Sequence, residues 1–231
     1  MNESPIAAMF DRISPQYDRL NHLLSLNIDR SWRSKTAKMV VGLPSQTILD
    51  IASGTADLAI AIAKSNPDSH IIGVDISEKM LAIGKAKIEK QGLSNQIELS
   101  IGDAAALPFE DNSFDIVTVA FGVRNFEDRN KSLSEIHRVL KPKGMVLILE
   151  FSMPTKFPLK PVYLFYFKHI LPTIGKWISK DTNAYTYLPE SVEQFPEPTD
   201  FMRMLSDNYL IESSARHLSG GIATLYSTIK G

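Results

Sequence analysis

The stretch "ILDIASGTADLA" at residues 48–59 decides the fold of this chain. An apolar run ends in an acid, a loop of small residues follows, and an apolar helical pattern begins after the loop. This order is typical of a strand, a tight turn and a helix, the arrangement that places nucleotides in open α/β sheets. Alanines stand where the dinucleotide fingerprint has glycines. The stretch therefore predicts an α/β fold and leaves open which ligand its loop accommodates.

Similar apolar runs, rich in β-branched residues, recur along the chain and alternate with helical patterns. We expect strands at 47–52, 70–76, 96–103, 114–121 and 144–151, with helices at 77–92 and 129–144. Such alternation is typical of strand-helix-strand units and a mostly parallel sheet. The C-terminal segment predicts a helix and two strands joined through residues 219–221, and this hairpin makes one strand antiparallel. The fold class is therefore α/β.

The amino-acid composition limits which classes of partner and which cellular compartment we expect. The 231 residues include 25 basic and 26 acidic side chains, so there is no global positive field and we expect no nucleic-acid partner. The absence of cysteine excludes disulfides and thiolate chemistry. The start lacks a basic region followed by an apolar core, and no uncharged run approaches the roughly 18 to 20 residues needed to cross a bilayer. We expect a cytoplasmic protein.

The chain is expected to form one domain over residues 1–231 with four parts. These are an N-terminal helical lid at 1–40, a cofactor-binding core at 41–152, an insertion at 153–192 that faces substrate or membrane, and a C-terminal helix and strand pair at 193–231. Within the insertion, residues 156–180 hold five lysines and six aromatic residues but no Asp or Glu. This composition predicts a helical lid that contacts the anionic inner leaflet of the membrane. The alternative is an element packed against the N-terminal helices or a second subunit of a homodimer.

Acidic residues follow the predicted strands and indicate the ligand. Asp50 and Asp57 flank the first loop, where their charges would repel a pyrophosphate at the helix N-terminus. S-adenosylmethionine has a ribose, a sulfonium and an ammonium, but no phosphate. Asp75 at the end of the second strand can accept hydrogen bonds from ribose hydroxyls. Asp103 can accept from the adenine amino group, and the following Ala104 leaves room for the ring. A helix cap or loop role is the alternative for each acid.

The motifs at these strand ends resemble the class I S-adenosylmethionine-dependent methyltransferases. The resemblance rests on D-x-A-x-G-x-A at 50–56, Asp75, "GDAAALPF" at 102–109 and "FDIV" at 114–117. It covers about residues 40–150 and the C-terminal end. It implies a three-layer Rossmann-like fold with a seven-stranded sheet in the order 3-2-1-4-5-7-6. It also implies cofactor contacts from Asp50, Gly54, Thr55, Asp75, Asp103 and Ala104.

Longer motifs are similar to the quinone-biosynthesis C-methyltransferases, and this match runs nearly end to end. They are "YDRLNHLLSLNIDRSW" at 17–32, "FGVRN" at 121–125, "RVLKPKGMVLILEFS" at 138–152 and "YTYLPES" at 185–191. The family makes menaquinone from demethylmenaquinone or methylates the ubiquinone precursor. The resemblance implies methyl transfer to a ring carbon of a polyprenylated quinol, with menaquinone preferred. Asp29, Lys143 and Ala120 depart from the residues that many or some relatives carry there.

C-methylation requires electron density on the ring carbon, most simply by loss of a phenolic proton. Arg124 and Asn125 follow the fourth strand at the edge where ligands gather, and the resemblance points to the same pair. Because Arg124 is always protonated, we expect it to stabilise the phenolate and to orient a water that accepts the proton. The alternative is a surface ion pair with Glu127 or Asp128.

Tyr17 and Tyr187 are candidate substrate contacts, whereas His70 and His137 are expected to be structural. His22 could close over the cofactor or serve the core. The sequence shows no His, Asp and Glu cluster with ligand spacing, so we expect no metal. Three other functions stay open: methylation of a sterol or small phenol, a catalytically silent scaffold of a lipid-synthesis complex, and a nicotinamide dehydrogenase.

Overall fold

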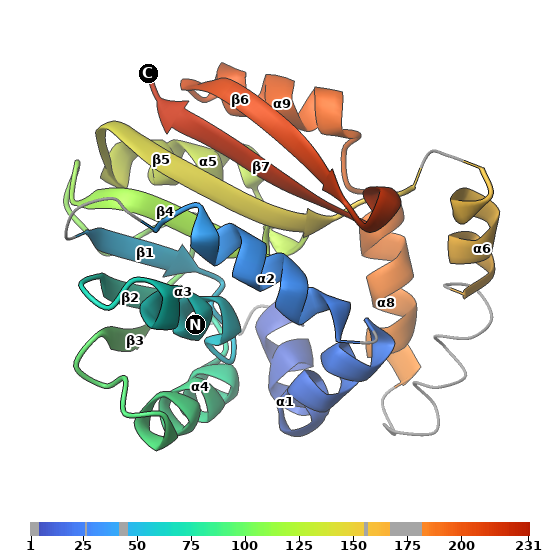
Figure 1. The fold of residues 1–231 in the computed structure, drawn as a ribbon, viewed down its shortest axis with the longest axis horizontal. Helices are drawn as coiled ribbons and strands as arrows, with labels where there is room; N and C mark the ends of the chain where they lie inside the picture. Colours follow the sequence, from blue (N-terminus) through green and yellow to red (C-terminus); the bar gives the residue numbers. More distant parts are fainter. Residues whose placement is uncertain (1–4, 26, 42–45, 155–156, 167–181) are drawn as a thin grey trace.

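The structure is a computed structural model that describes residues 5–25, 27–41, 46–154, 157–166 and 182–231. A central twisted sheet carries helices on both faces (Figure 1). The sheet has seven strands in the order β3-β2-β1-β4-β5-β7-β6, as the resemblance implied. The strands are β1 Thr47–Ile51, β2 His70–Asp75, β3 Ile97–Ile101, β4 Phe114–Ala120, β5 Leu140–Phe151, β6 Leu210–Leu218 and β7 Ala223–Lys230.

Helices and short turns connect these strands. They are α1 Pro5–Leu24, α2 Ile28–Lys38, α3 Asp57–Ser65, α4 Glu78–Lys90, η1 Val123–Asn125, α5 Arg129–Val139, α6 Leu159–Phe165, α8 Thr182–Glu193, α9 Pro198–Asp207 and η3 Ser219–Gly221. The hydroxyl of Ser77 accepts a 3.2 Å hydrogen bond from the Met80 N–H, so Ser77 caps α4 as its position predicts.

Alternating residues of the central strands face two separate helical layers. Leu49 and Val117 pack in the apolar cluster that includes α5 and α9, whereas their neighbours Ile48 and Ile116 pack against α2, α3 and α4. Both faces of the parallel strands are therefore buried, which explains why their sequences are continuous apolar runs. The result is the predicted three-layer α/β arrangement, with the carboxyl ends of β1, β2, β3 and β4 along one edge.

The junction of α5 and β5 differs from the prediction. The helix ends at Val139 and the strand begins at Leu140, whereas Pro142 and Gly144 were expected to end a helix that continued to residue 144. The pairing of β4 with β5 changes register here, so the extra residues bulge from the ladder. Lys143 takes a left-handed conformation with φ of 62° in this bulge. A proline that lacks an N–H is tolerated where the ladder is already interrupted.

The C-terminal strands pair as the hairpin signal predicted. β7 runs antiparallel to both β5 and β6, and η3 joins β6 to β7. Gly220 has a φ of 73°, which strains a residue with a side chain, and a Cβ built there would lie 2.3 Å from the end of the Leu159 side chain of α6, so the position favours glycine. Leu159 of α6 therefore lies against the turn that joins β6 to β7.

Candidate active site

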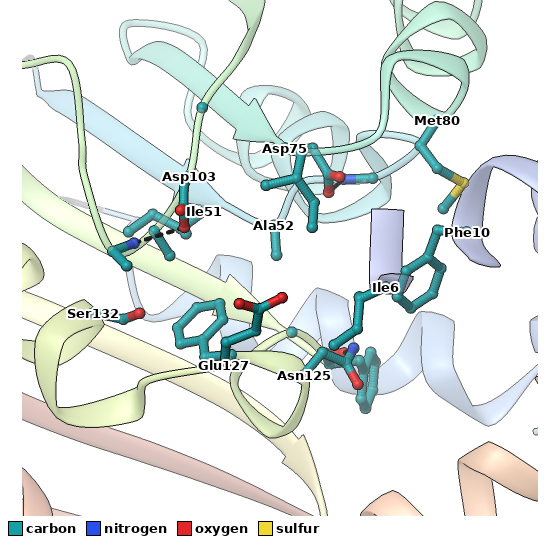
Figure 2. A pocket seen from close by; sticks show the side chains of 18 of the residues that line it. Ile6, Phe10, Ile51, Ala52, Asp75, Met80, Asp103, Asn125, Glu127 and Ser132 are labelled. Atoms are coloured by element: carbon teal, nitrogen blue, oxygen red, sulfur yellow. Dashed lines mark hydrogen bonds between the residues drawn. The ribbon is translucent and has the colours of Figure 1, made fainter. Parts of the chain in front are cut away.

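A cavity of about 360 Å³ opens at the carboxyl edge of the sheet. Figure 2 shows its wall, formed by side chains at the ends of β1, β2 and β4 together with Ile6 and Phe10 of α1. Its volume lies in the range of roughly 300 to 1,000 Å³ typical of small-molecule sites. Six of the predicted site residues line it: Tyr17, Gly54, Asp75, Asp103, Ala104 and Asn125. Six of the ten residues predicted from the sequence therefore share one cavity.

The loop after β1 is built from left-handed residues. Ala52, Gly54 and Ala56 have φ values of 53°, 53° and 65°. Left-handed alanines carry a penalty of roughly 1 to 2 kcal/mol each, so the surrounding structure must hold this turn. At Gly54 an added Cβ would lie 3.3 Å from the methyl carbon of Met80. The loop keeps side chains small on the side where the backbone meets the cavity.

Asp75 fixes this loop from the end of β2. Its Oδ2 accepts a 2.8 Å hydrogen bond from the Gly54 N–H, and its Oδ1 accepts a 2.9 Å hydrogen bond from the Ser77 N–H. Burial raises the pKa of Asp75, while these backbone donors oppose the rise. Each carboxylate oxygen has a second lone pair, so Asp75 can still accept from a ligand in the cavity.

Asp50 lies beside the cavity rather than in its wall. It lines a second hollow of about 20 Å³, together with Tyr17, Arg33 and Thr55. Thr118 donates a 2.6 Å hydrogen bond to Asp50 Oδ1, whereas Oδ2 has no hydrogen-bond partner among the described residues. Burial raises the pKa of Asp50 to about 7, against the Thr118 hydrogen bond and the charge of Arg33. A buried carboxylate oxygen without a donor favours a cationic or hydrogen-bonding ligand.

Asp103 and Ala104 follow β3 and line the cavity, and Figure 2 shows Asp103 on the side opposite Phe10. Asp103 is exposed, and its Oδ1 accepts a 2.9 Å hydrogen bond from the Ala105 N–H. Ala104 is buried. This geometry leaves acceptor capacity on Asp103 and a small side chain next to it, which are the two features that the adenine contact requires.

Thr55 is engaged by the N-terminal helix. Its hydroxyl donates a 2.5 Å hydrogen bond to Asp18 of α1, and the ammonium of Lys87 on α4 lies 2.9 Å from the other oxygen of Asp18. Lys87 also forms an ion pair with Asp57. Lys87 therefore partly neutralises the negative charge that Asp57 brings to the loop after β1. Nothing near Lys87 in the sequence signals this contact with α1.

Three potential metal ligands meet beside the loop, although the sequence showed no ligand spacing. His22 Nδ1 lies 2.8 Å from Asp29 Oδ2, and His22 Nε2 lies 3.7 Å from Asp57 Oδ2. Arg33 forms an ion pair with Asp29 at the same place. Burial opposes ionisation of Asp29, but hydrogen bonds and the nearby cations keep its pKa below the ordinary value. Arg33 and Lys87 therefore already neutralise Asp29 and Asp57, and we interpret the cluster as an internal ion-pair network.

Arg124 is held inside the protein by an acid of the sheet. Its Nη1 lies 2.7 Å from Glu150 Oε1, and its backbone N–H donates a 3.1 Å hydrogen bond to Glu150 Oε2. The sequence alternative named the surface acids Glu127 and Asp128 and missed Glu150. The available signal was a glutamate inside the apolar run "LILEF" at 147–151. Arg124 does not line the cavity, whereas the adjoining Asn125 does.

Two tyrosines lie near the Arg124 and Asn125 pair. The Tyr187 hydroxyl donates a 2.9 Å hydrogen bond to Asn125 Oδ1, so α8 reaches the wall of the cavity. Tyr17 lines both hollows. Burial raises the pKa of Tyr17 and of Tyr187, and the charge of Arg124 opposes the rise in each. The two candidate substrate contacts therefore lie within the electrostatic reach of one arginine.

Known proteins are similar in sequence to this chain over nearly its full length. A family model described as the ubiE/COQ5 methyltransferase family matches residues 1–230. A demethylmenaquinone methyltransferase of Bacteroides fragilis is 45% identical over 225 residues, which cover 97% of this chain and 92% of the relative. The ubiquinone/menaquinone biosynthesis C-methyltransferase UbiE of Geobacter sulfurreducens is 43% identical over 227 residues, which cover 98% and 88%.

A solved structure supports the fold independently. The crystal structure of a SAM dependent methyltransferase from Aquifex aeolicus superposes with a TM-score of 0.64 at 18% identity, covering 86% of this chain and 89% of that one. At this identity the likeness concerns the fold alone. With the family match over residues 1–230, the resemblance seen in the motifs is confirmed. The chain belongs to the ubiE/COQ5 methyltransferase family.

Proposed function

We propose that the chain transfers a methyl group from S-adenosylmethionine to a ring carbon of demethylmenaquinol and so forms menaquinol. The observation that carries this proposal is a single cavity whose wall joins Asp75, at the end of β2, to Asn125, next to Arg124 after β4. An acid suited to the cofactor ribose and Asn125, the neighbour of the candidate catalytic Arg124, thus line one cavity. The family and the names of its members support the same reaction.

The described residues fit the proposed cofactor. Asp75 would accept from the ribose hydroxyls, and Asp103 with Ala104 would hold the adenine. The partnerless Oδ2 of Asp50 suits a cationic group, because a buried acceptor gains most from a charged donor. When bound, S-adenosylmethionine supplies an electrophilic methyl group. No phosphate-binding run of glycines competes with this assignment.

The chain's own contribution to the reaction is alignment and electrostatics. Arg124 would stabilise the negative charge that develops on the quinol oxygen as its proton leaves to water. Asn125 and Tyr187 would orient the ring through the hydrogen bond that joins them. Phe10 and Tyr17 of α1 line the cavity, where their rings would limit the access of water to the bound reactants.

Cofactor binding should depend on pH through Asp50. Because its pKa is raised to about 7, the unliganded protein carries a proton there in acid, and a cationic ligand favours the ionised form. Affinity for S-adenosylmethionine should therefore rise by up to about tenfold per pH unit as pH approaches 7, and should level off above it. Calorimetric titration between pH 5.5 and 8.5 measures this. The Asp50→Asn variant should bind more weakly without the slope, and a slope that persists in it would assign the effect elsewhere.

The insertion supports a membrane contact. Val162 and Phe165 of α6 are 61% and 59% exposed, and Phe157, which precedes the N-cap of this helix, is 88% exposed. Tyr163 of the same helix is buried. Four of the five lysines, at 156, 168, 176 and 180, lie outside the described residues, and Lys160 is exposed on α6. No described helix is both long and apolar enough to span a bilayer. Apolar side chains beside excess lysine suit the surface of an anionic bilayer.

Sedimentation with vesicles that contain anionic lipid tests this contact. Each lysine near such a surface contributes about 1 kcal/mol, so changing all five to Gln should reduce binding by about a thousandfold or more, and salt should weaken binding of the wild type. The matched control changes five other exposed lysines to Gln: Lys35, Lys38, Lys64, Lys85 and Lys90. Equal losses in both variants would mean that total charge alone matters. Undiminished binding of the first variant would leave the insertion as a packing element, against α1 and α2 or against a second subunit.

The function itself is tested in cells. Lipid extracts of cells that lack the protein should accumulate demethylmenaquinone and lose menaquinone, and the gene supplied in trans should restore it. Normally methylated quinones in the deletion strain would contradict the proposal. A scaffold without activity predicts that the Arg124→Lys variant restores menaquinone fully, whereas the proposed reaction predicts that it does not.

A further inference from the structure

Glu150 is the most deeply buried charged group at the site. It lies on β5, directly opposite Thr224 of β7, and its relative exposure is 0%. Its Oε1 accepts a 2.8 Å hydrogen bond from the Phe151 N–H in addition to the contact with Arg124 Nη1. Its Oε2 accepts from the Arg124 N–H. One carboxylate therefore grips both the backbone and the side chain of Arg124.

The donors of the Arg124 guanidinium are almost fully assigned. Nη1 donates to Glu150 and also to the carbonyl oxygen of Phe121, and Nε donates to Ser191 Oγ at 3.3 Å. The guanidinium carbon lies 5.3 Å from the centre of the Phe151 ring. Among the described residues, Nη2 has no hydrogen-bond partner. A planar fork held at Nη1 and Nε has one orientation, which leaves Nη2 as the donor for an outside oxygen.

The residues around Arg124 indicate which side of the protein its Nη2 faces. The charge of Arg124 acts on the phenols of Tyr17, Tyr163 and Tyr187, which come from α1, α6 and α8. These elements are the N-terminal lid and the insertion, and they lie outside the sheet (Figure 1). The ion pair thus anchors the arginine to the sheet while its charge acts on the side where an acceptor would enter.

We infer that Glu150 is a positioning residue that locks the Arg124 guanidinium so that Nη2 is presented to the oxygen of the methyl acceptor. This inference rests on the proposed function. A purely structural ion pair is the competing explanation, but a buried pair often gives no more stability than apolar residues of the same volume. The grip on both the backbone and the side chain of Arg124 is what an orienting role requires. A stabilising role does not need it.

The first test measures orientation directly and needs no methyl acceptor. In protein with ¹⁵N-labelled arginine, the guanidinium of Arg124 should give separate Nη signals, because its rotation is blocked. The signals are assigned by their loss in Arg124→Lys. In Glu150→Gln they should merge into one averaged signal, whereas Thr224→Val, the control on the opposing strand, should keep them separate. Separate signals in Glu150→Gln would overturn the inference whatever the enzyme acts on.

The second test uses the coupling between the two residues. Glu150→Gln should lower kcat about tenfold to a hundredfold, since a small misplacement of a catalytic group costs that much, while the cofactor Kd stays within about twofold. In an Arg124→Lys background the same change should cost less than about threefold, because the two residues act as one unit. An equal loss in both backgrounds would show that Glu150 acts independently. If Glu150→Gln does not fold, Glu150→Asp keeps the charge with a shorter reach and should show the same pattern. A wild type inactive on demethylmenaquinol would refute the proposed function but leave the signals of the first test informative.

Discussion

Arg124→Lys should lower kcat for methyl transfer by about 10²-fold, a loss comparable to removal of one oxyanion-stabilising donor. Lysine keeps the charge, but a single ammonium cannot replace the fork that binds Glu150, the Phe121 carbonyl and Ser191 at once. The cofactor Kd should change little, because the proposed cofactor contacts Asp75, Asp103 and Ala104 lie at or just after the ends of β2 and β3, whereas Arg124 follows β4. Steady-state kinetics with reduced acceptor, together with cofactor titration, measures both quantities.

A matched control for this variant lies on α5. Arg138→Lys removes the fork of an arginine that is also ion-paired, with Glu135 and Asp111. Its other donors bind the carbonyl oxygens of Phe109 and Leu107 and not residues next to Asn125. It should leave kcat unchanged. Full turnover in Arg124→Lys would remove this residue from the reaction. A fall in cofactor affinity equal to the fall in kcat would instead place it in cofactor binding.

Asp75→Ala should weaken S-adenosylmethionine binding by about tenfold to a hundredfold. Loss of charge-assisted hydrogen bonds to the ribose costs about 1.5 to 3 kcal/mol. The structure adds a second contribution, because the N–H groups of Gly54 and Ser77 lose their acceptor and the loop before α3 loses its anchor. Asp75→Asn keeps one acceptor oxygen, so its Kd for S-adenosylmethionine should lie between those of Asp75→Ala and the wild type. Isothermal titration gives the Kd, and thermal unfolding checks the fold.

Asp115→Ala is the control for that effect. Asp115 lies near the start of β4, where it accepts a hydrogen bond from the Thr47 N–H and pairs with Lys141, at the opposite edge of the sheet. Its loss should affect stability while leaving cofactor affinity intact. If Asp115→Ala weakened binding as much as Asp75→Ala, the effect would reflect the fold in general. If Asp75→Ala bound normally, Asp75 would not be a cofactor contact.

Local patterns were sufficient to predict most of the fold. Strands buried on both faces leave unbroken apolar runs, and a cap such as Ser77 marks where a helix begins, so the elements of residues 47–139 fall close to their predicted positions. The bulge at Pro142 could not be predicted in the same way, because proline and glycine after a helical pattern also mark a helix end. Tertiary pairing with β4 decided between the two.

The sequence predicted which residues at strand ends lie together at the cavity, and it missed the contacts that form between distant elements of the fold. Asp75 and Asn125 follow strands, and topology brings them to one edge. Glu150 and Lys87 act through contacts with Arg124, Asp18 and Asp57, which lie on other elements. No local period encodes such pairings. The roles assigned to these residues stay predictions until the variants are measured.

The central claim is methyl transfer to a reduced quinone ring, and one incubation tests it most directly. Purified protein is mixed with S-adenosylmethionine carrying a labelled methyl group and with demethylmenaquinol, oxidised demethylmenaquinone or the reduced ubiquinone precursor. The account predicts label on the ring of menaquinol from the reduced acceptor, little from the ubiquinone precursor and none from the oxidised form, which has no phenolic proton to lose. Label that never enters the quinol, or that enters the oxidised quinone equally well, would contradict it.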